Sequence, residues 1–180
     1  MEITKFEITG PLLIKLKKFS DNRGFFVERF RSDLFKEIGL TMGFCQENFS
    51  RSHPQVLRGL HYQYKKPQGK LITVTRGTIF DVAVDVRKES PTFGKHIAIE
   101  LSGDEPTWFW IPSGFAHGFC ALGSQEADLL YKVDNYYDPK GETGIHWNDI
   151  ELQIAWPIKA PLVNEKDQLL PRLSNQQLLL

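Results

Sequence analysis

Residues 56–64 carry side chains that are poor material for a protein core and suited to chemistry. If the segment is a strand, its side chains alternate between two faces, and Gly59, His61 and Gln63 share one of them. Arg58 then falls on the other face, among leucine and tyrosine. A face of glycine, histidine and glutamine suits the wall of a polar cavity, where a histidine with a pKa of about 6.5 can exchange protons near neutral pH.

A second histidine follows a turn of proline and glycine. Pro112, Gly114 and His117 stand in the spacing Pro-x-Gly-x-x-His, which resembles the second half of the cupin metal-binding motif. The first half usually supplies two histidines and a glutamate, whereas residues 61–63 read His-Tyr-Gln with no carboxylate just downstream. Two histidines and a glutamine fall short of the three good ligands that a catalytic transition metal needs. We therefore expect no metal, and keep a metal-dependent cupin oxygenase or isomerase built on the two histidines and Gln63 as an alternative.

Several cationic side chains stand near aromatic residues and amides. Lys70 begins an otherwise apolar strand at 71–75, so we expect its amine to point inward. Arg23 and Arg58 belong to segments where a guanidinium can bind a phosphate through two hydrogen bonds. The chain carries 22 basic and 22 acidic residues, so its net charge is zero. This balance argues against a nonspecific nucleic-acid binder, which needs excess positive charge, and leaves room for a local phosphate site.

Length and composition indicate a single domain, residues 1–180, since domains average roughly 150 residues. The apolar runs are interrupted by aspartates such as Asp81 and Asp85, and none approaches the roughly 20 residues that span a bilayer, so we expect no membrane protein. The N-terminus lacks the pattern of a signal peptide. Cys45 and Cys120 have no CxxC spacing, so we expect reduced, buried thiols in a cytoplasmic protein.

The elements that must position these groups are mostly strands. Apolar and polar residues alternate with the period of a half-buried strand at 78–87, and similar patterns occur at 71–75, 96–101 and 108–111. Turns rich in glycine, proline, serine and aspartate separate the strands, and no helices alternate with them. We therefore predict an all-β protein, an antiparallel jelly-roll barrel with a few short helices.

Two of these short helices are predicted from capping signals. Ser32 can cap a helix at 33–38 that ends at Gly39, and Asn164 can cap a turn that begins at 165–167. The second signal places the carboxylate of Asp167 near a helix start, where an aspartate most often caps the helix or faces solvent.

Eight short strings, in order along the chain, resemble those of one enzyme family. They are residues 21–26 (DNRGFF), 46–52 (QENFSRS), 56–63 (VLRGLHYQ), 67–71 (PQGKL), 81–85 (DVAVD), 90–94 (SPTFG), 111–119 (IPSGFAHGF) and 165–167 (EKD). One such string can match by chance, whereas eight strings in the same order over nearly the whole chain are specific evidence for the family. The chain thus resembles the dTDP-4-dehydrorhamnose 3,5-epimerase family, cupin-fold enzymes of the dTDP-rhamnose pathway.

The resemblance implies an epimerase without metal or cofactor that inverts C3 and C5 of dTDP-4-dehydro-6-deoxy-glucose to give dTDP-4-dehydro-L-rhamnose. It implies that His61 is the general base and that Asp167 orients it. Tyr131 is then the proton donor on the opposite face of the sugar, and Lys70 lies beside the developing enolate. The residues it implies in dTDP-sugar binding are Arg23, Glu28, Gln46, Asn48, Arg58, His117, Tyr137, Glu142 and Lys166, with Tyr137 stacked on thymine.

The resemblance further implies a homodimer, which exposed edge strands and an apolar stretch at 11–14 can support through strand exchange. Two other functions remain open besides the metal-dependent cupin. A single-site epimerase would invert C3 or C5 alone in a related nucleotide deoxysugar. A catalytically silent module would bind the sugar nucleotide only, and the joint presence of His61, Tyr131 and Asp167 argues against it. Asn164 stands where the family usually has serine. This difference bears on the detailed contacts with the substrate more than on the type of reaction.

Overall fold

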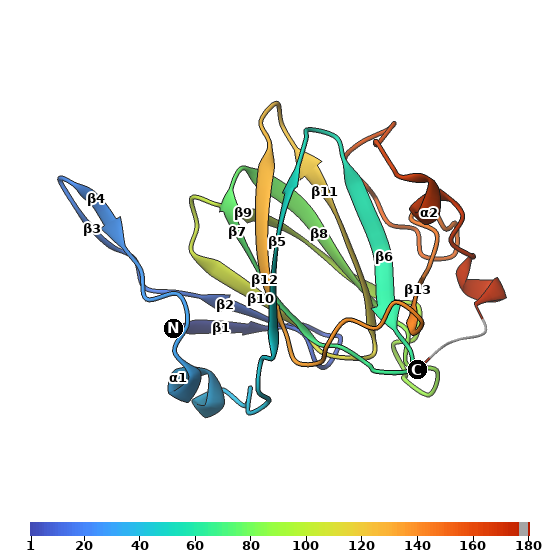
Figure 1. Ribbon diagram of the computed structural model, residues 1–180, viewed down its shortest axis with the longest axis horizontal. Coiled ribbons are helices and arrows are strands. Elements are labelled where there is room, and N and C mark those ends of the chain that lie inside the picture. Colours follow the sequence, from blue (N-terminus) through green and yellow to red (C-terminus); the bar gives the residue numbers. More distant parts are fainter. Residues whose placement is uncertain (177–179) are drawn as a thin grey trace.

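Two antiparallel sheets face each other in the computed structural model, which describes residues 1–176 and 180 (Figure 1). The larger sheet has the order β1-β2-β10-β7-β12-β5, with strands β1 (Glu2–Lys5), β2 (Leu12–Lys15), β10 (Thr107–Ile111), β7 (Lys70–Arg76), β12 (Ala127–Val133) and β5 (Gln46–Ser52). The smaller sheet has the order β13-β6-β11-β8-β9, with strands β13 (Glu142–Gly144), β6 (Leu57–Gln63), β11 (Phe115–Leu122), β8 (Thr78–Asp85) and β9 (His96–Ser102). Neighbouring strands in both sheets run antiparallel, which confirms the predicted all-β jelly roll.

The main core lies between the two sheets. Ile72 and Val74 of β7 enter it from the larger sheet, and Phe115 and Phe119 of β11 enter it from the smaller sheet. Because side chains alternate along a strand, each strand contributes about every second residue to this core. Phe119 and Leu129 also border the cavity described below, so the core and the cavity share the space between the sheets.

Strand β8 is buried on both faces, whereas the sequence predicts a half-buried strand. Val82 and Val84 face away from the main core and form a second cluster with Leu152 and Leu173, which belong to the chain that follows β13. The C-terminal segment therefore covers the outer face of this strand. Alternation within one strand does not reveal such a cover, because the covering residues lie far away in the sequence.

The described residues form three short helices: α1 (Ser32–Glu37), α2 (Glu165–Gln168) and the 3-10 helix η1 (Leu173–Asn175). Helix α1 begins one residue earlier than predicted. Its N-cap is Arg31 and no side chain caps it, so the predicted cap by Ser32 is wrong. Phe35 is buried in an apolar cluster on the outer surface of the larger sheet, and this packing holds the helix in place of a cap. The predicted cap of α2 by Asn164 is confirmed.

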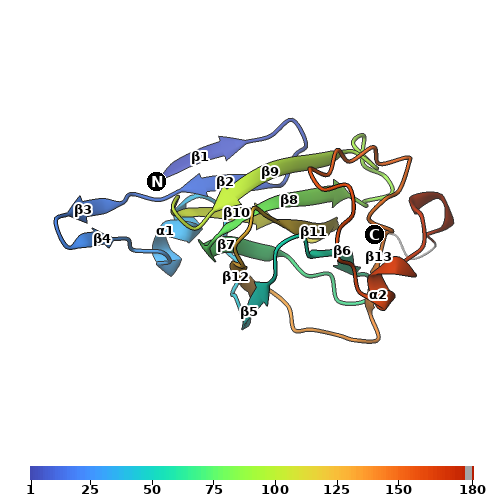
Figure 2. The ribbon, with the colours of Figure 1, turned by 90° about the horizontal axis from the view of Figure 1, so that it is seen from above.

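A hairpin of β3 (Phe19–Asp21) and β4 (Gly24–Phe26) forms a separate sheet and projects from the body (Figures 1 and 2). All of its residues are exposed, and the side chains of Phe25 and Phe26 are 61% and 66% exposed. With Phe19, they place three large apolar side chains on one projecting arm. Grouped apolar surface of this kind is typical of sites that contact another molecule.

The two cysteines differ from each other in burial. Both are free thiols, and Cys120 is buried as predicted, but Cys45 is exposed because it lies in the connection just before the edge strand β5. Among residues 1–176, no helix is long and apolar enough to cross a membrane.

Candidate active site

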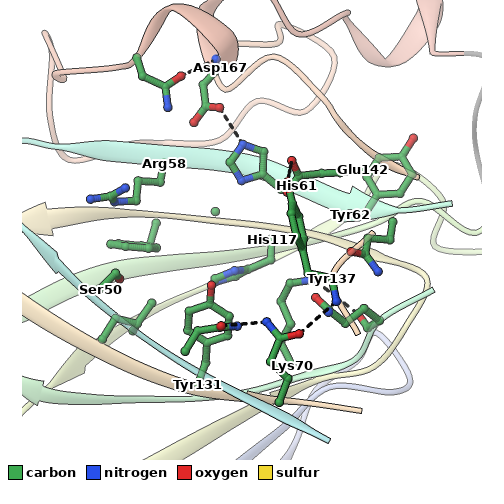
Figure 3. A pocket seen from close by; sticks show the side chains of 18 residues that line it. Ser50, Arg58, His61, Tyr62, Lys70, His117, Tyr131, Tyr137, Glu142 and Asp167 are labelled. Carbon is green, nitrogen blue, oxygen red and sulfur yellow. Dashed lines mark hydrogen bonds and ion pairs between the residues drawn. The ribbon is translucent and has the colours of Figure 1, made fainter. Parts of the chain in front are cut away.

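A cavity of about 390 Å³ opens between the two sheets (Figure 3). The smaller sheet lines it with Arg58, His61, Tyr62, Gln63, His117, Gly118, Phe119 and Glu142. The larger sheet lines it with Gln46, Asn48, Ser50, Lys70, Leu129 and Tyr131. Loops and helix α2 add Gln68, Tyr137, Asn164 and Asp167. The cavity therefore brings together residues that are as much as 121 positions apart in the chain, from Gln46 to Asp167.

His61 and Asp167 form a hydrogen-bonded pair at one wall. His61 Nε2 lies 2.7 Å from Asp167 Oδ1, and the backbone N–H of Gly59 donates to Asp167 Oδ2 at 2.9 Å. Burial opposes ionisation of this carboxyl, yet the hydrogen bonds from His61 and Gly59 outweigh it and hold the pKa of Asp167 below its usual value. An ionised carboxylate only accepts hydrogen bonds, so Nε2 of His61 carries the proton and Nδ1 is the basic atom.

Helix α2 fixes Asp167 for this contact. Asn164 Oδ1 accepts the backbone N–H of Asp167 at 2.7 Å, which is the N-cap hydrogen bond of a helix of four residues. The side chain of Asp167 is almost entirely buried, and the side chain of His61 is 29% exposed. The carboxylate is therefore inaccessible, while the imidazole reaches the cavity.

Tyr131 approaches the cavity from β12 of the opposite sheet (Figure 3). Burial, together with the negative charge of Glu142, raises the pKa of its phenol, while Arg58 and a hydrogen bond with Asn48 act in the opposite sense. The phenol is thus neutral at physiological pH and carries a proton that it can donate.

Lys70 is buried at the start of β7. Its ammonium donates to the backbone carbonyl of Gln68 at 3.4 Å, which is a weak contact. Burial lowers the pKa of Lys70 to about 8, although Asp134 and Glu142 favour its charged form. The amine therefore loses its positive charge within the range of pH in which an enzyme can be assayed, which is uncommon for a lysine.

His117 belongs to a second histidine–aspartate pair, between neighbouring strands β11 and β8. Its Nε2 lies 2.9 Å from Oδ2 and 3.1 Å from Oδ1 of Asp81, a carboxylate that is fully buried. The imidazole is nearly buried and faces the same cavity as His61, whose strand pairs with β11 at this position. No pattern in the sequence predicts Asp81 as a partner of His117, because the two residues come together only through the pairing of β8 with β11.

Tyr137, Glu142 and Lys166 form a connected group in the cavity wall and at its edge. The hydroxyl of Tyr137 donates to Glu142 Oε2 at 3.1 Å, and Lys166 makes an ion pair with the same oxygen. Lys166 does not itself line the cavity. Half of the Tyr137 side chain is exposed, so its ring is accessible to a ligand.

Arg58 lines the cavity beside His61, which corrects the face that strand alternation predicts for it. The exception arises at Gly59, whose φ of +114° lies in the region that favours glycine, and the pairing with β11 shifts register here. A Cβ atom at position 59 would come within 2.6 Å of the Cα of Gly118, so no other residue fits. Arg58 Nε donates to Ser52 Oγ at 3.0 Å and Nη2 donates to the Arg51 carbonyl at 3.2 Å.

Arg23 and Glu28 lie outside the cavity, so within one chain they do not reach the binding site that the family resemblance implies for them. Arg23 is at the tip of the projecting hairpin, exposed and paired with Asp21 at 2.6 Å. Glu28 follows the hairpin and pairs with Arg31 at 3.4 Å. The reason is that the hairpin extends away from β6 and α2 instead of folding back over them (Figure 1).

Some cavity residues have no role in the sequence analysis. Ser50 follows Gln46 and Asn48 at the same spacing of two, so strand alternation would have found it. Gln68, Phe119 and Leu129 carry no such signal, because only the packing of the two sheets brings them to the cavity. Within residues 1–176 and 180, no group of three His, Cys, Asp or Glu side chains is arranged to hold a metal ion.

The chain is similar to known proteins along nearly its whole length. Residues 5–175 match the family model described as dTDP-4-dehydrorhamnose 3,5-epimerase. The dTDP-4-dehydrorhamnose 3,5-epimerase of Shigella flexneri is 48% identical over 169 residues, which cover 93% of each chain. The dTDP-4-dehydrorhamnose 3-epimerase of Streptomyces niveus is 38% identical over 170 residues, which cover 93% of this chain and 82% of the relative.

A solved structure shares the fold. The crystal structure of dTDP-6-deoxy-D-glucose-3,5-epimerase from Legionella pneumophila, in complex with dTDP-4-keto-L-rhamnose, has a TM-score of 0.93 to this chain and is 45% identical to it. The superposition covers 97% of this chain and 93% of the other. A score this high over the full length means that both sheets and their connections follow the same course.

Proposed function

The chain belongs to the dTDP-4-dehydrorhamnose 3,5-epimerase family, and on that premise we propose that it converts dTDP-4-dehydro-6-deoxy-glucose into dTDP-4-dehydro-L-rhamnose through His61 and Tyr131. The strongest support is that these two side chains line one cavity from opposite sheets (Figure 3). Inversion of a carbon requires a proton to leave one face of the sugar ring and another to arrive at the opposite face. An acid and a base on facing walls meet this requirement.

His61 is the base in this proposal. The ketone at C4 acidifies the C–H bonds at C3 and C5, so an imidazole can remove a proton from either carbon. Asp167 holds the Nε2–H of His61 at 2.7 Å, which leaves the lone pair on Nδ1 to take that proton. The buried carboxylate then stabilises the imidazolium that forms, as an orienting aspartate does in other histidine pairs.

Lys70 acts on the intermediate. Loss of the proton moves negative charge onto the former ketone oxygen, and a preorganised donor beside such an oxygen contributes roughly 3 to 4 kcal/mol to the transition state. A buried ammonium with one weak hydrogen bond to a backbone carbonyl can meet this oxygen at little cost in reorganisation. His117, held by Asp81, is placed to assist from the neighbouring strand.

Tyr131 completes the inversion by donating its proton to the other face of the enolate. Its pKa lies above the usual value, so the phenol holds the proton until a strongly basic carbon is presented. After the first inversion His61 holds the proton that it removed and Tyr131 has lost the proton that it gave, so both groups must be reset by proton exchange with water. With that exchange, the same two side chains can carry out a second round at the other carbon.

Arg58 is the cation in the cavity wall that we assign to the diphosphate. Its guanidinium is held by Ser52 and the Arg51 carbonyl, and among the described residues it has no carboxylate partner. A cation without an acidic partner at the wall of a cavity favours a phosphate. Tyr137 is assigned to the thymine ring, and the remaining contacts to dTDP-sugar are assigned to Gln46, Asn48, His117, Glu142 and Lys166.

Deuterium exchange tests this function. In deuterated water, we expect the wild-type protein to incorporate deuterium at both C3 and C5 of dTDP-4-dehydro-6-deoxy-glucose, measured by NMR. His61→Asn should suppress exchange at both carbons by on the order of 10²-fold to 10⁴-fold, the usual contribution of a general base. Exchange near the wild-type rate in this variant would remove His61 from the mechanism.

The same spectra separate the alternative functions. Exchange at one carbon only would indicate a single-site epimerase. The identities favour this alternative less, because the chain is 38% identical to the 3-epimerase of Streptomyces niveus and 48% identical to the 3,5-epimerase of Shigella flexneri. No exchange, with dTDP binding intact, would indicate a silent binding module. Activity that depends on a stoichiometric transition metal would indicate a metal-dependent cupin.

We also propose a homodimer in which the hairpin of one chain reaches the cavity of the other. Arg23 cannot serve the cavity of its own chain in this conformation, yet it stands at the tip of an arm with the exposed rings of Phe25 and Phe26. A second copy would bury these rings and receive the guanidinium beside the diphosphate. The free thiols fit a reducing compartment, so we propose a cytoplasmic location, which cell fractionation can test.

A further inference from the structure

The loop at residues 134–138 carries Tyr137 and is held by the side chains of glutamines. Gln46 Oε1 accepts the backbone N–H of Tyr137 at 3.1 Å. Gln68 Nε2 donates to the backbone carbonyl of Asn135 at 2.6 Å. These contacts come from different strands and connections, so the loop is fixed from more than one side.

Gln63 makes the central contacts of this arrangement. Its Oε1 accepts the backbone N–H of Asp138 at 2.8 Å, and its Nε2 donates to the carbonyls of Tyr136 at 3.2 Å and Lys66 at 2.8 Å. One buried amide thus binds the residue before Tyr137 and the residue after it. Only an amide can donate and accept in this way, because a carboxylate lacks the donor and an apolar chain lacks both.

The ring of Tyr137 is tied to the same place in the fold. Its hydroxyl donates to Glu142, and Glu142 pairs directly with Gln63 between strands β13 and β6. Position 63 therefore contacts the backbone on both sides of Tyr137 and neighbours the residue that holds the end of its ring. Half of the Tyr137 side chain nevertheless stays exposed toward a ligand.

We propose that Gln63 is a positioning residue that holds the ring of Tyr137 ready for a flat ligand group, the nucleobase of dTDP. The inference rests on the proposed function through the assignment of Tyr137 to that base. A loop that is ordered before binding spares the ligand the cost of ordering it, so Gln63 contributes to affinity through the position of Tyr137. Its amide makes no hydrogen bond to His61, Asp167 or Tyr131 in the described structure.

The test uses Gln63→Met, which keeps the length of the side chain and removes its hydrogen bonds. We expect the Kd for dTDP, measured by calorimetry, and the KM for the dTDP-sugar to rise on the order of tenfold, with kcat within about twofold of wild type. Gln63→Glu keeps the acceptor for Asp138 but turns a carboxylate toward the carbonyls of Tyr136 and Lys66, so its Kd for dTDP should also rise above that of wild type, and an unchanged Kd would overturn the proposal. If Gln63→Met does not fold, Gln63→Glu measured against wild type decides the question.

Gln176→Met is the matched control. Gln176 is also a buried glutamine, and its Nε2 donates to the carbonyl of Gly144 at 2.7 Å and to Thr143 Oγ1 at 3.2 Å, two partners that lie in β13 and outside the loop at 134–138. We expect this variant to lose thermal stability as Gln63→Met does and to keep the wild-type Kd for dTDP. A rise in Kd equal to that of Gln63→Met would show a general effect of stability and would overturn the proposal.

A double-mutant cycle separates positioning from a purely structural role. In a Tyr137→Ala background, Gln63→Met should change the Kd for dTDP by less than about twofold, because the ring that it positions is gone. An undiminished tenfold effect would overturn the inference. Wild-type protein that binds dTDP but performs no epimerisation would instead refute the proposed function, and the binding measurements would still decide the role of Gln63.

Discussion

The phenol of Tyr131 and the imidazole of His61 serve opposite halves of the reaction, so removal of the phenol has a distinctive consequence. In Tyr131→Phe, His61 can still take a proton and return it to the same face. We expect the rate of product formation to fall by on the order of 10²-fold or more while deuterium still enters the substrate without inversion. The measurement is NMR of recovered substrate and product, and normal turnover would show that another group donates the proton.

The pH dependence of the reaction should report the ionisation of Lys70. Its pKa is about 8, and the charged form is the one that stabilises the enolate, so this contribution is present well below pH 8, is halved at that value and is lost as the pH rises further. We expect kcat/KM to fall on the alkaline side near pH 8. Tyr131 does not account for this limb, because its pKa is raised from an already high value.

The matched variant is Lys70→Met, which keeps an apolar chain in the buried position and removes the charge. The activity of this variant should fall by about 10²-fold to 10³-fold, the usual effect of removing a preorganised donor, and the limb near pH 8 should disappear from its profile. A limb that persists in Lys70→Met would assign it to a different group.

At the level of elements, the short helix α2 supports catalysis through its cap. Asn164 binds the backbone N–H of Asp167, and the carboxylate of Asp167 binds His61. Asn164 therefore acts on the proposed base only through Asp167. Asn164→Ala should lower the free energy of unfolding by about 1 kcal/mol, the usual value of an N-cap. We expect kcat to fall by about tenfold as well, because the carboxylate is less firmly placed.

Asn164→Ser is the control for this prediction, since serine also caps helices. It should restore most of the stability and of kcat. If Asn164→Ala loses stability and keeps full kcat, the cap serves the fold alone.

At the level of the whole molecule, a mixture of two inactive variants can show whether Arg23 acts across a dimer. Arg23→Ala and His61→Asn chains are co-expressed or mixed after unfolding and refolding. If Arg23 reaches the partner's cavity, each mixed dimer has one complete site, and a random mixture should recover about a quarter of wild-type activity. If Arg23 serves its own chain, no site is complete and the mixture stays as inactive as its components.

Features that depend on residues close together in the chain can be predicted from the sequence alone. Alternation of apolar and polar residues predicts the strands at 71–75, 78–87, 96–101 and 108–111. The residue type at position 164 predicts the N-cap of α2. Short strings in order along the chain indicated the family, which the family match from 5 to 175 bears out. These signals are local, so they survive without knowledge of how the chain folds back on itself.

Which distant residues come into contact depends on how the whole chain folds and cannot be predicted from local patterns. The C-terminal segment covers β8, and the hairpin carries Arg23 away from its own cavity. The backbone conformation of Gly59 and the register shift against β11 bring Arg58 to the cavity beside His61. Each of these outcomes depends on contacts between segments far apart in the sequence. The periodicity within one strand carries no information about such contacts. The physical reason is that a strand specifies its own two faces, whereas the neighbour on each face is chosen by packing of the whole chain.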